Sequence, residues 1–70
     1  MPTPILTAEQ GEALESLIDR ASVQSVLYAI AVICREKAQH IQENWQDSTT
    51  AGCWRFTAAH VEKAAKKAEV

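Results

Sequence analysis

Val26-Leu27-Tyr28-Ala29-Ile30-Ala31-Val32-Ile33-Cys34 is an unbroken apolar stretch near the middle of the 70-residue chain. On a helix, such a run covers every side and needs neighbours on more than one of them. Nowhere in the sequence do polar and apolar residues alternate over the length of a strand, so we predict no sheet. We therefore expect an all-α fold in which this stretch belongs to a long central helix.

An apolar stripe upstream of this stretch predicts a first amphipathic helix over about residues 7–20. Thr7 is its candidate N-cap, and Gln10 three residues later fits a capping box. On one continuous helix, this stripe and the central one would face opposite ways. We therefore expect the chain to reverse near residues 19–22, with Ser22 capping the second helix. The members of the first stripe are Ala13, Leu14, Leu17, Ile18 and Ala21.

The central helix is predicted over about residues 23–46 and a third helix over about residues 51–68. We expect the central stripe to face the other helices and the run Asp47-Ser48-Thr49-Thr50 to form a turn. The alanine-rich end of the third helix has little to bury, so we expect it to fray. The central stripe comprises Val23, Val26, Leu27, Ile30, Ile33, Cys34, Ala38, Ile41 and Trp45.

The length allows one domain over residues 1–70, a three-helix hairpin or bundle with a long central helix. Residues 1–4, with two prolines, are expected to form a stiff or frayed lead-in. Within such a bundle Tyr28, Val32 and Phe56 have no evident cover. Small domains often need a second chain to complete their core, so we expect self-association with a dimer favoured. The alternative is that a few exposed apolar residues are ordinary on a monomer.

Polar residues flank the stripe of the central helix at Lys37, His40 and Asn44, and Trp45 follows them. They could fix register across an interface, as a buried Asn does in coiled coils, or form a solvated rim. The candidate interface therefore comprises Tyr28, Val32, Lys37, His40, Asn44, Trp45 and Phe56.

The sequence predicts no catalytic or cofactor site, and we expect the protein not to be an enzyme. Its two glycines are isolated, so no glycine-rich phosphate loop exists. Cys53 and His60 lie two helical turns apart, which is too far for a nucleophile and its base. In a hairpin, Cys34 and Cys53 would be about 10–12 Å apart, beyond the reach of a disulfide.

A metal or small ligand at a subunit interface is one alternative function. Glu36 and His40 lie four residues apart on one helix face, but a tight site needs about four ligands, and no Cys or His pair is close in sequence to complete one. We therefore predict no metal site.

The net charge of −2 disfavours nucleic acid as a partner, because phosphate neutralisation drives much of that binding. Nucleic-acid binding or regulation through the basic end, at Arg55, Lys63, Lys66 and Lys67, is the other alternative. The nine-residue apolar run is less than half a membrane span, so no membrane association is expected. The first residues carry no basic segment typical of a secretory signal, which favours the cytoplasm and reduced thiols.

The run Glu36-Lys37-Ala38-Gln39-His40-Ile41-Gln42-Glu43-Asn44-Trp45-Gln46-Asp47 resembles a segment of small bacterial proteins, cyanobacterial ones among them. These carry a Glu-Lys-Ala-x-His-Ile-x-x-Asn-Trp-Gln-Asp run after an apolar helix, and the likeness covers about residues 17–65. The resemblance implies a small helical domain and brings no activity or functional residue with it. Our leading hypothesis is a non-enzymatic, self-associating helical interaction or adaptor protein.

Overall fold

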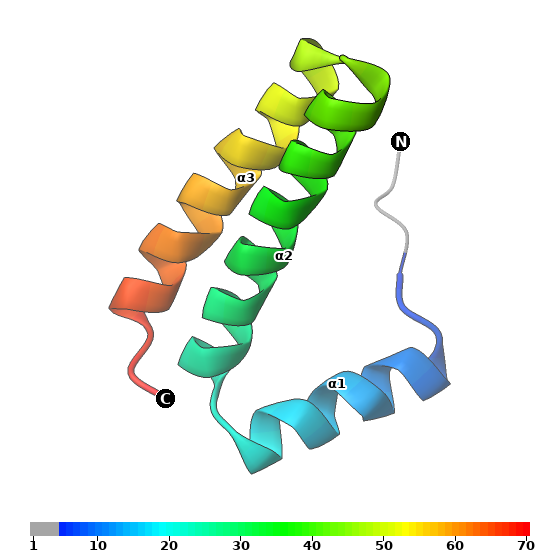
Figure 1. Ribbon diagram of the computed structural model, residues 1–70. Coiled ribbons are helices and arrows are strands. Elements are labelled where there is room, and N and C mark those ends of the chain that lie inside the picture. The colour runs from blue at the N-terminus through cyan, green and yellow to red at the C-terminus, as the bar shows by residue number, and fades with distance from the viewer. Residues whose placement is uncertain (1–4) are drawn as a thin grey trace.

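Three α-helices make up most of residues 5–70, the part of the chain that the computed structural model describes. They are α1 (Ala8–Arg20), α2 (Val23–Trp45) and α3 (Ser48–Lys67). α2 and α3 form an antiparallel hairpin, and α1 extends away from its base (Figure 1). These residues contain no strand, which confirms the all-α prediction. The predicted lead-in at residues 1–4 lies outside the described residues.

Side-chain caps begin α1 and α2 where the sequence predicts. The hydroxyl of Thr7 accepts a hydrogen bond from the backbone N–H of Gln10 at 3.1 Å, and the Gln10 side chain accepts one from the N–H of Thr7 at 2.9 Å. The hydroxyl of Ser22 accepts the N–H of Ser25 at 2.9 Å. The chain bends by 117° between these helices, so α1 stands off from the hairpin instead of lying against it.

The turn between α2 and α3 is shorter than the four residues predicted. Gln46 adopts a left-handed conformation with φ of 50° and ends α2. The carboxylate of Asp47 accepts the backbone N–H of Thr50 at 3.0 Å and its hydroxyl at 2.6 Å. Asp47 is therefore the N-cap, and α3 begins at Ser48, three residues before the predicted position.

The core between α2 and α3 consists of small side chains only. Within residues 5–70 no large side chain is fully buried. The alanines of the core recur every seven residues, a spacing that keeps them on one face of each helix. Small side chains at the contact allow the two helix axes to approach closely. The buried residues are Ala31, Cys34 and Ala38 on α2, and Ala51, Ala58 and Ala65 on α3.

The large apolar residues of the predicted central stripe are not all in this core, and that expectation was wrong for three of them. Ile30 and Ile33 are exposed, and Trp45 is 73% exposed. The reason is the orientation of α2, which directs Ala31, Cys34 and Ala38 toward α3 and leaves the neighbouring isoleucines at the side of the contact.

The C-terminal end of α3 is held against α2, contrary to the expected fraying. The helix continues to Lys67, and Ala65 is fully buried. The side-chain amide of Gln24 donates to the carbonyl of Ala65 at 2.8 Å. The backbone N–H of Gln24 donates to the carbonyl of Val70 at 2.8 Å. Gln24, in the first turn of α2, thus donates hydrogen bonds to backbone carbonyls at and just beyond the end of α3.

Candidate interaction surface

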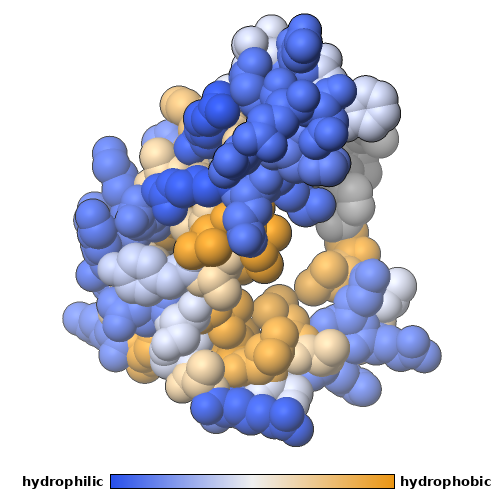
Figure 2. All heavy atoms as spheres, in the orientation of Figure 1, coloured by the Kyte–Doolittle hydropathy of each residue, from blue (hydrophilic) through white to orange (hydrophobic). Residues whose placement is uncertain are grey.

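An open apolar groove lies between α1 and α2. Its volume is about 330 Å³, and a single hydroxyl, that of Ser25, is the only polar side-chain group in its lining. Figure 2 shows hydrophobic side chains gathered on both sides of the opening. The groove is lined by Leu14, Leu17 and Ala21 from the α1 side and by Ser25, Val26, Ala29, Ile30 and Ile33 from α2.

The walls of the groove expose large aliphatic side chains to solvent. Leu17 is 56% exposed, and Ile33 is 49% exposed. Contiguous apolar surface on a folded chain commonly marks an interaction site, whereas scattered apolar residues do not. Because these side chains converge on one groove from two helices, they form a contiguous surface.

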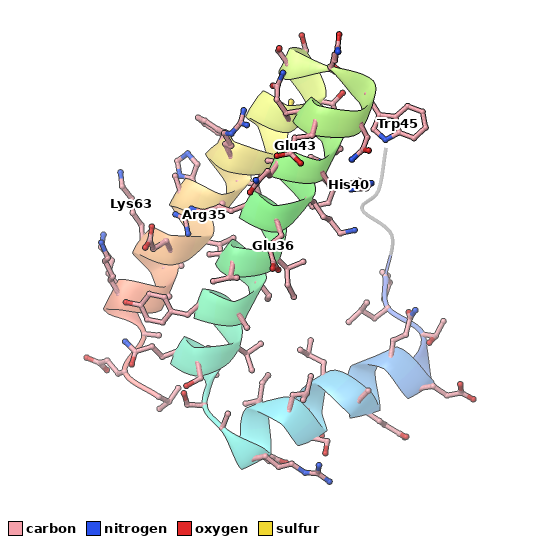
Figure 3. All side chains as sticks on the ribbon, viewed as in Figure 1. Arg35, Glu36, His40, Glu43, Trp45 and Lys63 are labelled. Atoms are coloured by element: carbon pink, nitrogen blue, oxygen red, sulfur yellow. The ribbon has the colours of Figure 1, made fainter. Side chains whose placement is uncertain are left out.

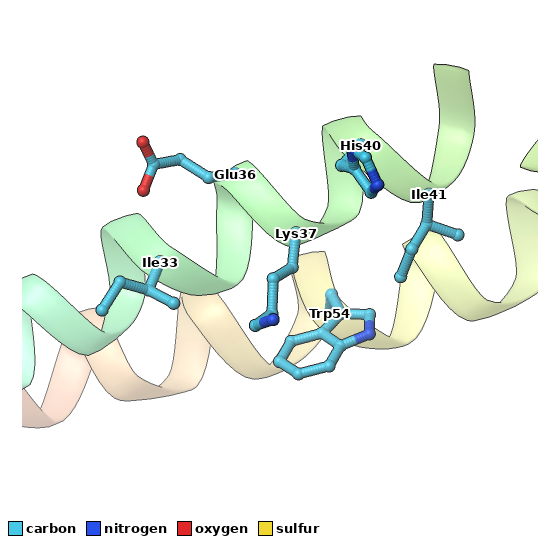
Figure 4. A pocket seen from close by; sticks show the side chains of 6 residues that line it. All are labelled: Ile33, Glu36, Lys37, His40, Ile41 and Trp54. Carbon is cyan, nitrogen blue, oxygen red and sulfur yellow. The ribbon is translucent and has the colours of Figure 1, made fainter. Parts of the chain in front are cut away.

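A second pocket of about 350 Å³ adjoins the groove at Ile33, which lines both. Its other lining residues are Glu36, Lys37, His40, Ile41 and Trp54 (Figure 4). The Lys37 ammonium lies 5.7 Å from the centroid of the Trp54 ring, a cation–π distance. Figure 4 shows the Glu36 carboxylate pointing away from this pair. The groove and this pocket together form one continuous surface, which we call the open face.

The polar flank predicted from the sequence lies along the open face. Lys37 and His40 line the pocket. The Asn44 amide lies 3.0 Å from Nδ1 of His40 and donates to the His40 carbonyl at 2.9 Å. Asn44 is thus the hydrogen-bond partner of His40. Figure 3 shows Trp45 projecting beyond His40 on the same side of α2.

The remaining candidate residues lie elsewhere. Tyr28, Val32 and Phe56 line neither the groove nor the pocket. Phe56 is exposed and packs edge-on against the ring of His60, with centroids 4.4 Å apart. Arg35 follows Tyr28 by seven residues and so shares its face. There it forms a 2.6 Å salt bridge with Glu62. The face of Tyr28 therefore carries a charged pair that lies outside the open face.

Sequence reasoning missed the open face because it assigned Ile30 and Ile33 to the core. Two signals in the sequence could have found it. The alanines of the core recur at heptad spacing and mark the close contact between helices. A second set of α2 residues is separated by alternating intervals of four and three positions. This heptad spacing places the set on one face of the helix and indicates a second helix–helix contact. That set is Val26, Ile30, Ile33, Lys37, His40 and Asn44.

The titratable and thiol groups form no reactive cluster in the described part of the chain. Among residues 5–70, no three His, Cys, Asp or Glu side chains are placed to hold a metal ion. Cys34 and Cys53 are free thiols, the first buried and the second exposed. Hydrogen bonds from the Thr50 hydroxyl, and then from the backbone N–H of Thr50, hold the pKa of Asp47 below its ordinary value.

None of the three helices is by itself both long and apolar enough to cross a membrane, and α1 with α2 meets that test only as a pair bent by 117°. No family model matches the chain, and no curated protein or solved structure matches it.

Proposed function

We propose that this protein is a non-enzymatic helical interaction module that self-associates, with the dimer as its working form. One observation carries the proposal. The buried side chains are five alanines and a cysteine, whereas five larger aliphatic side chains of α1 and α2 line an open groove: Leu14, Leu17, Val26, Ile30 and Ile33. Alanine burial removes little apolar area from water, so the hairpin alone gains little hydrophobic stabilisation. A second copy would bury the larger residues.

The surface area and shape of the chain support the proposal. The chain exposes 5698 Å², whereas a compact monomer of 7.7 kDa exposes about 4,300 Å². The excess is comparable with the roughly 1,000 Å² or more that each partner buries in an obligate dimer. The radius of gyration is 13.8 Å, against about 11 Å for a compact domain of 70 residues.

Sedimentation equilibrium over a range of micromolar concentrations tests the proposal. We expect a mass of twice the 7.7 kDa of the chain at the upper end of the range. Circular dichroism on the same samples reports the helix content. A species that keeps the mass of one chain and full helix content at every concentration would contradict self-association.

A further inference from the structure

The side of α3 that points away from α2 carries a set of exposed basic and aromatic side chains. Its members lie within about 80° of Lys63 around the helix, whereas the three buried alanines of α3 lie on the opposite side. Figure 3 shows Lys63 projecting away from α2. We call this set the basic face, and it comprises Arg55, Phe56, His60, Lys63, Lys66 and Lys67.

The charge of the chain is divided between its helices. α3 carries four basic residues and one acidic residue, whereas α1 carries four acidic residues and one basic residue. α1 contacts α2 but not α3, and the two lie on opposite sides of α2 (Figure 1). The net charge of −2 is therefore not the charge that a ligand of the basic face would meet.

No carboxylate within the described part of the chain neutralises the basic face. Glu62, the one acidic residue of α3, forms its salt bridge with Arg35 of α2. This is the one ion pair among residues 5–70, so the three lysines of α3 present their ammonium groups to solvent. Cations spaced along one side of a helix attract a polyanion, because each contact with a phosphate releases a condensed counterion.

An exposed aromatic ring lies among these cations. Phe56 is 68% exposed, and the ring of His60 packs edge-on against it. This contact supports the phenyl ring from one side and leaves most of its surface open. Unpaired bases stack on such rings while neighbouring cations contact the phosphates, a combination typical of proteins that bind single strands.

We infer that the basic face binds single-stranded nucleic acid without sequence preference, with a base stacked on Phe56 and the basic side chains on phosphates. A duplex offers no unpaired base to this ring. A helix that lies on a membrane needs a broad free apolar face, whereas the apolar face of α3 is buried against α2. The inference does not depend on self-association, because Trp54, the α3 residue of the open face, lies on the opposite side of α3 from Lys63.

Fluorescence anisotropy of a dye-labelled single-stranded oligothymidylate of about 20 nucleotides, titrated with the full chain, tests the inference. We expect saturable binding at about 50 mM salt with a Kd on the order of 10–100 µM. Four phosphate contacts predict that log Kd rises with log salt concentration with a slope of about 3. Absence of binding at this salt concentration would overturn the inference. Tighter binding to a duplex of the same length, or to vesicles of phosphatidylcholine and phosphatidylserine, would overturn it as well.

Two exposed basic residues near the C-terminal ends of helices provide a matched pair of charge reversals. Lys63 belongs to the basic face, and Arg20 ends α1. Lys63→Glu should raise the Kd by at least about fivefold, because repulsion replaces a phosphate contact. Arg20→Glu changes the net charge equally and should alter the Kd by less than about twofold, since it lies far from the bound strand. Equal effects of the two variants would contradict binding at the basic face. Circular dichroism checks that both variants keep their helices.

Phe56→Leu tests base stacking separately from charge. Leucine is apolar but has no ring, so the Kd should rise by at least about fivefold while its salt dependence stays unchanged. Trp45→Leu removes a ring that is 73% exposed outside the basic face, and it should alter the Kd by less than about twofold. If Phe56→Leu weakens binding no more than Trp45→Leu does, no base stacks on Phe56 and the inference is wrong. Sedimentation equilibrium of the wild-type chain measures self-association independently, so the two proposals fail separately.

Discussion

At the scale of single residues, Asp47 determines where α3 begins. Its carboxylate accepts two hydrogen bonds from Thr50, one from the backbone N–H and one from the hydroxyl. These bonds favour the charged form of Asp47 and lower its pKa. The sequence indicated a turn with capping residues at this place. Four adjacent residues could each serve as the cap, so spacing alone could not select Asp47.

The lowered pKa predicts an acid-dependent part of the stability. A group with a depressed folded pKa stabilises the fold above its unfolded value and loses that contribution as the pH falls through the folded value. The melting temperature should therefore fall below about pH 4, partly through Asp47. Asp47→Asn keeps a capping side chain that does not titrate. We expect this variant to show a shallower loss of melting temperature between about pH 5 and pH 2. An acid profile equal to that of the wild type would show that the cap does not contribute to it.

At the scale of helices, the alanine spacing orients α2 against α3. Ala51, Ala58 and Ala65 are fully buried and stand seven residues apart. α3 packs against α2, and the buried residues of α2 are also small: Ala31, Cys34 and Ala38. The close contact between the two helices depends on the absence of larger groups along this line.

Adjacent alanines of α3 test this packing. Ala58 is fully buried and Ala59 is exposed. Ala58→Leu should lower the free energy of unfolding by about 1–3 kcal/mol, because added methylene groups overpack the contact. Ala59→Leu has the same change of composition and helix propensity, and we expect less than about 0.5 kcal/mol from it. Urea unfolding at one protein concentration measures both. Equal effects of the two variants would contradict close packing at Ala58.

The sequence predicted the helices better than it predicted their faces. The caps at Thr7 and Ser22 were confirmed because capping depends on neighbouring residues alone. The predicted orientation of α2 was wrong. Large hydrophobic side chains are usually expected in a core, which favoured Ile30 and Ile33, but the contact with α3 is made by the small residues beside them. A continuously apolar segment offers several faces of similar hydropathy, so periodicity could not distinguish an intrachain contact from an open one.

At the scale of the whole molecule, the chain leaves its larger apolar residues at the surface. The sequence led us to expect self-association but placed it partly at Tyr28, Val32 and Phe56, which lie outside the open face. Of the predicted interface, the structure brings Lys37 and His40 into the pocket on that face. The angle between α1 and α2 creates the groove, and no feature of residues 19–22 fixes that angle in the sequence.

The central claim is that a second copy completes the fold, so folding and association should be coupled. The most direct test is the melting temperature measured by circular dichroism over a hundredfold range of protein concentration. For a dimer that unfolds to separate chains, a hundredfold increase adds about 2.7 kcal/mol of stability. For two chains of this size we expect the melting temperature to rise by about 8–10 °C. A melting temperature that stays constant across this range would show that one chain folds alone, and would contradict the claim.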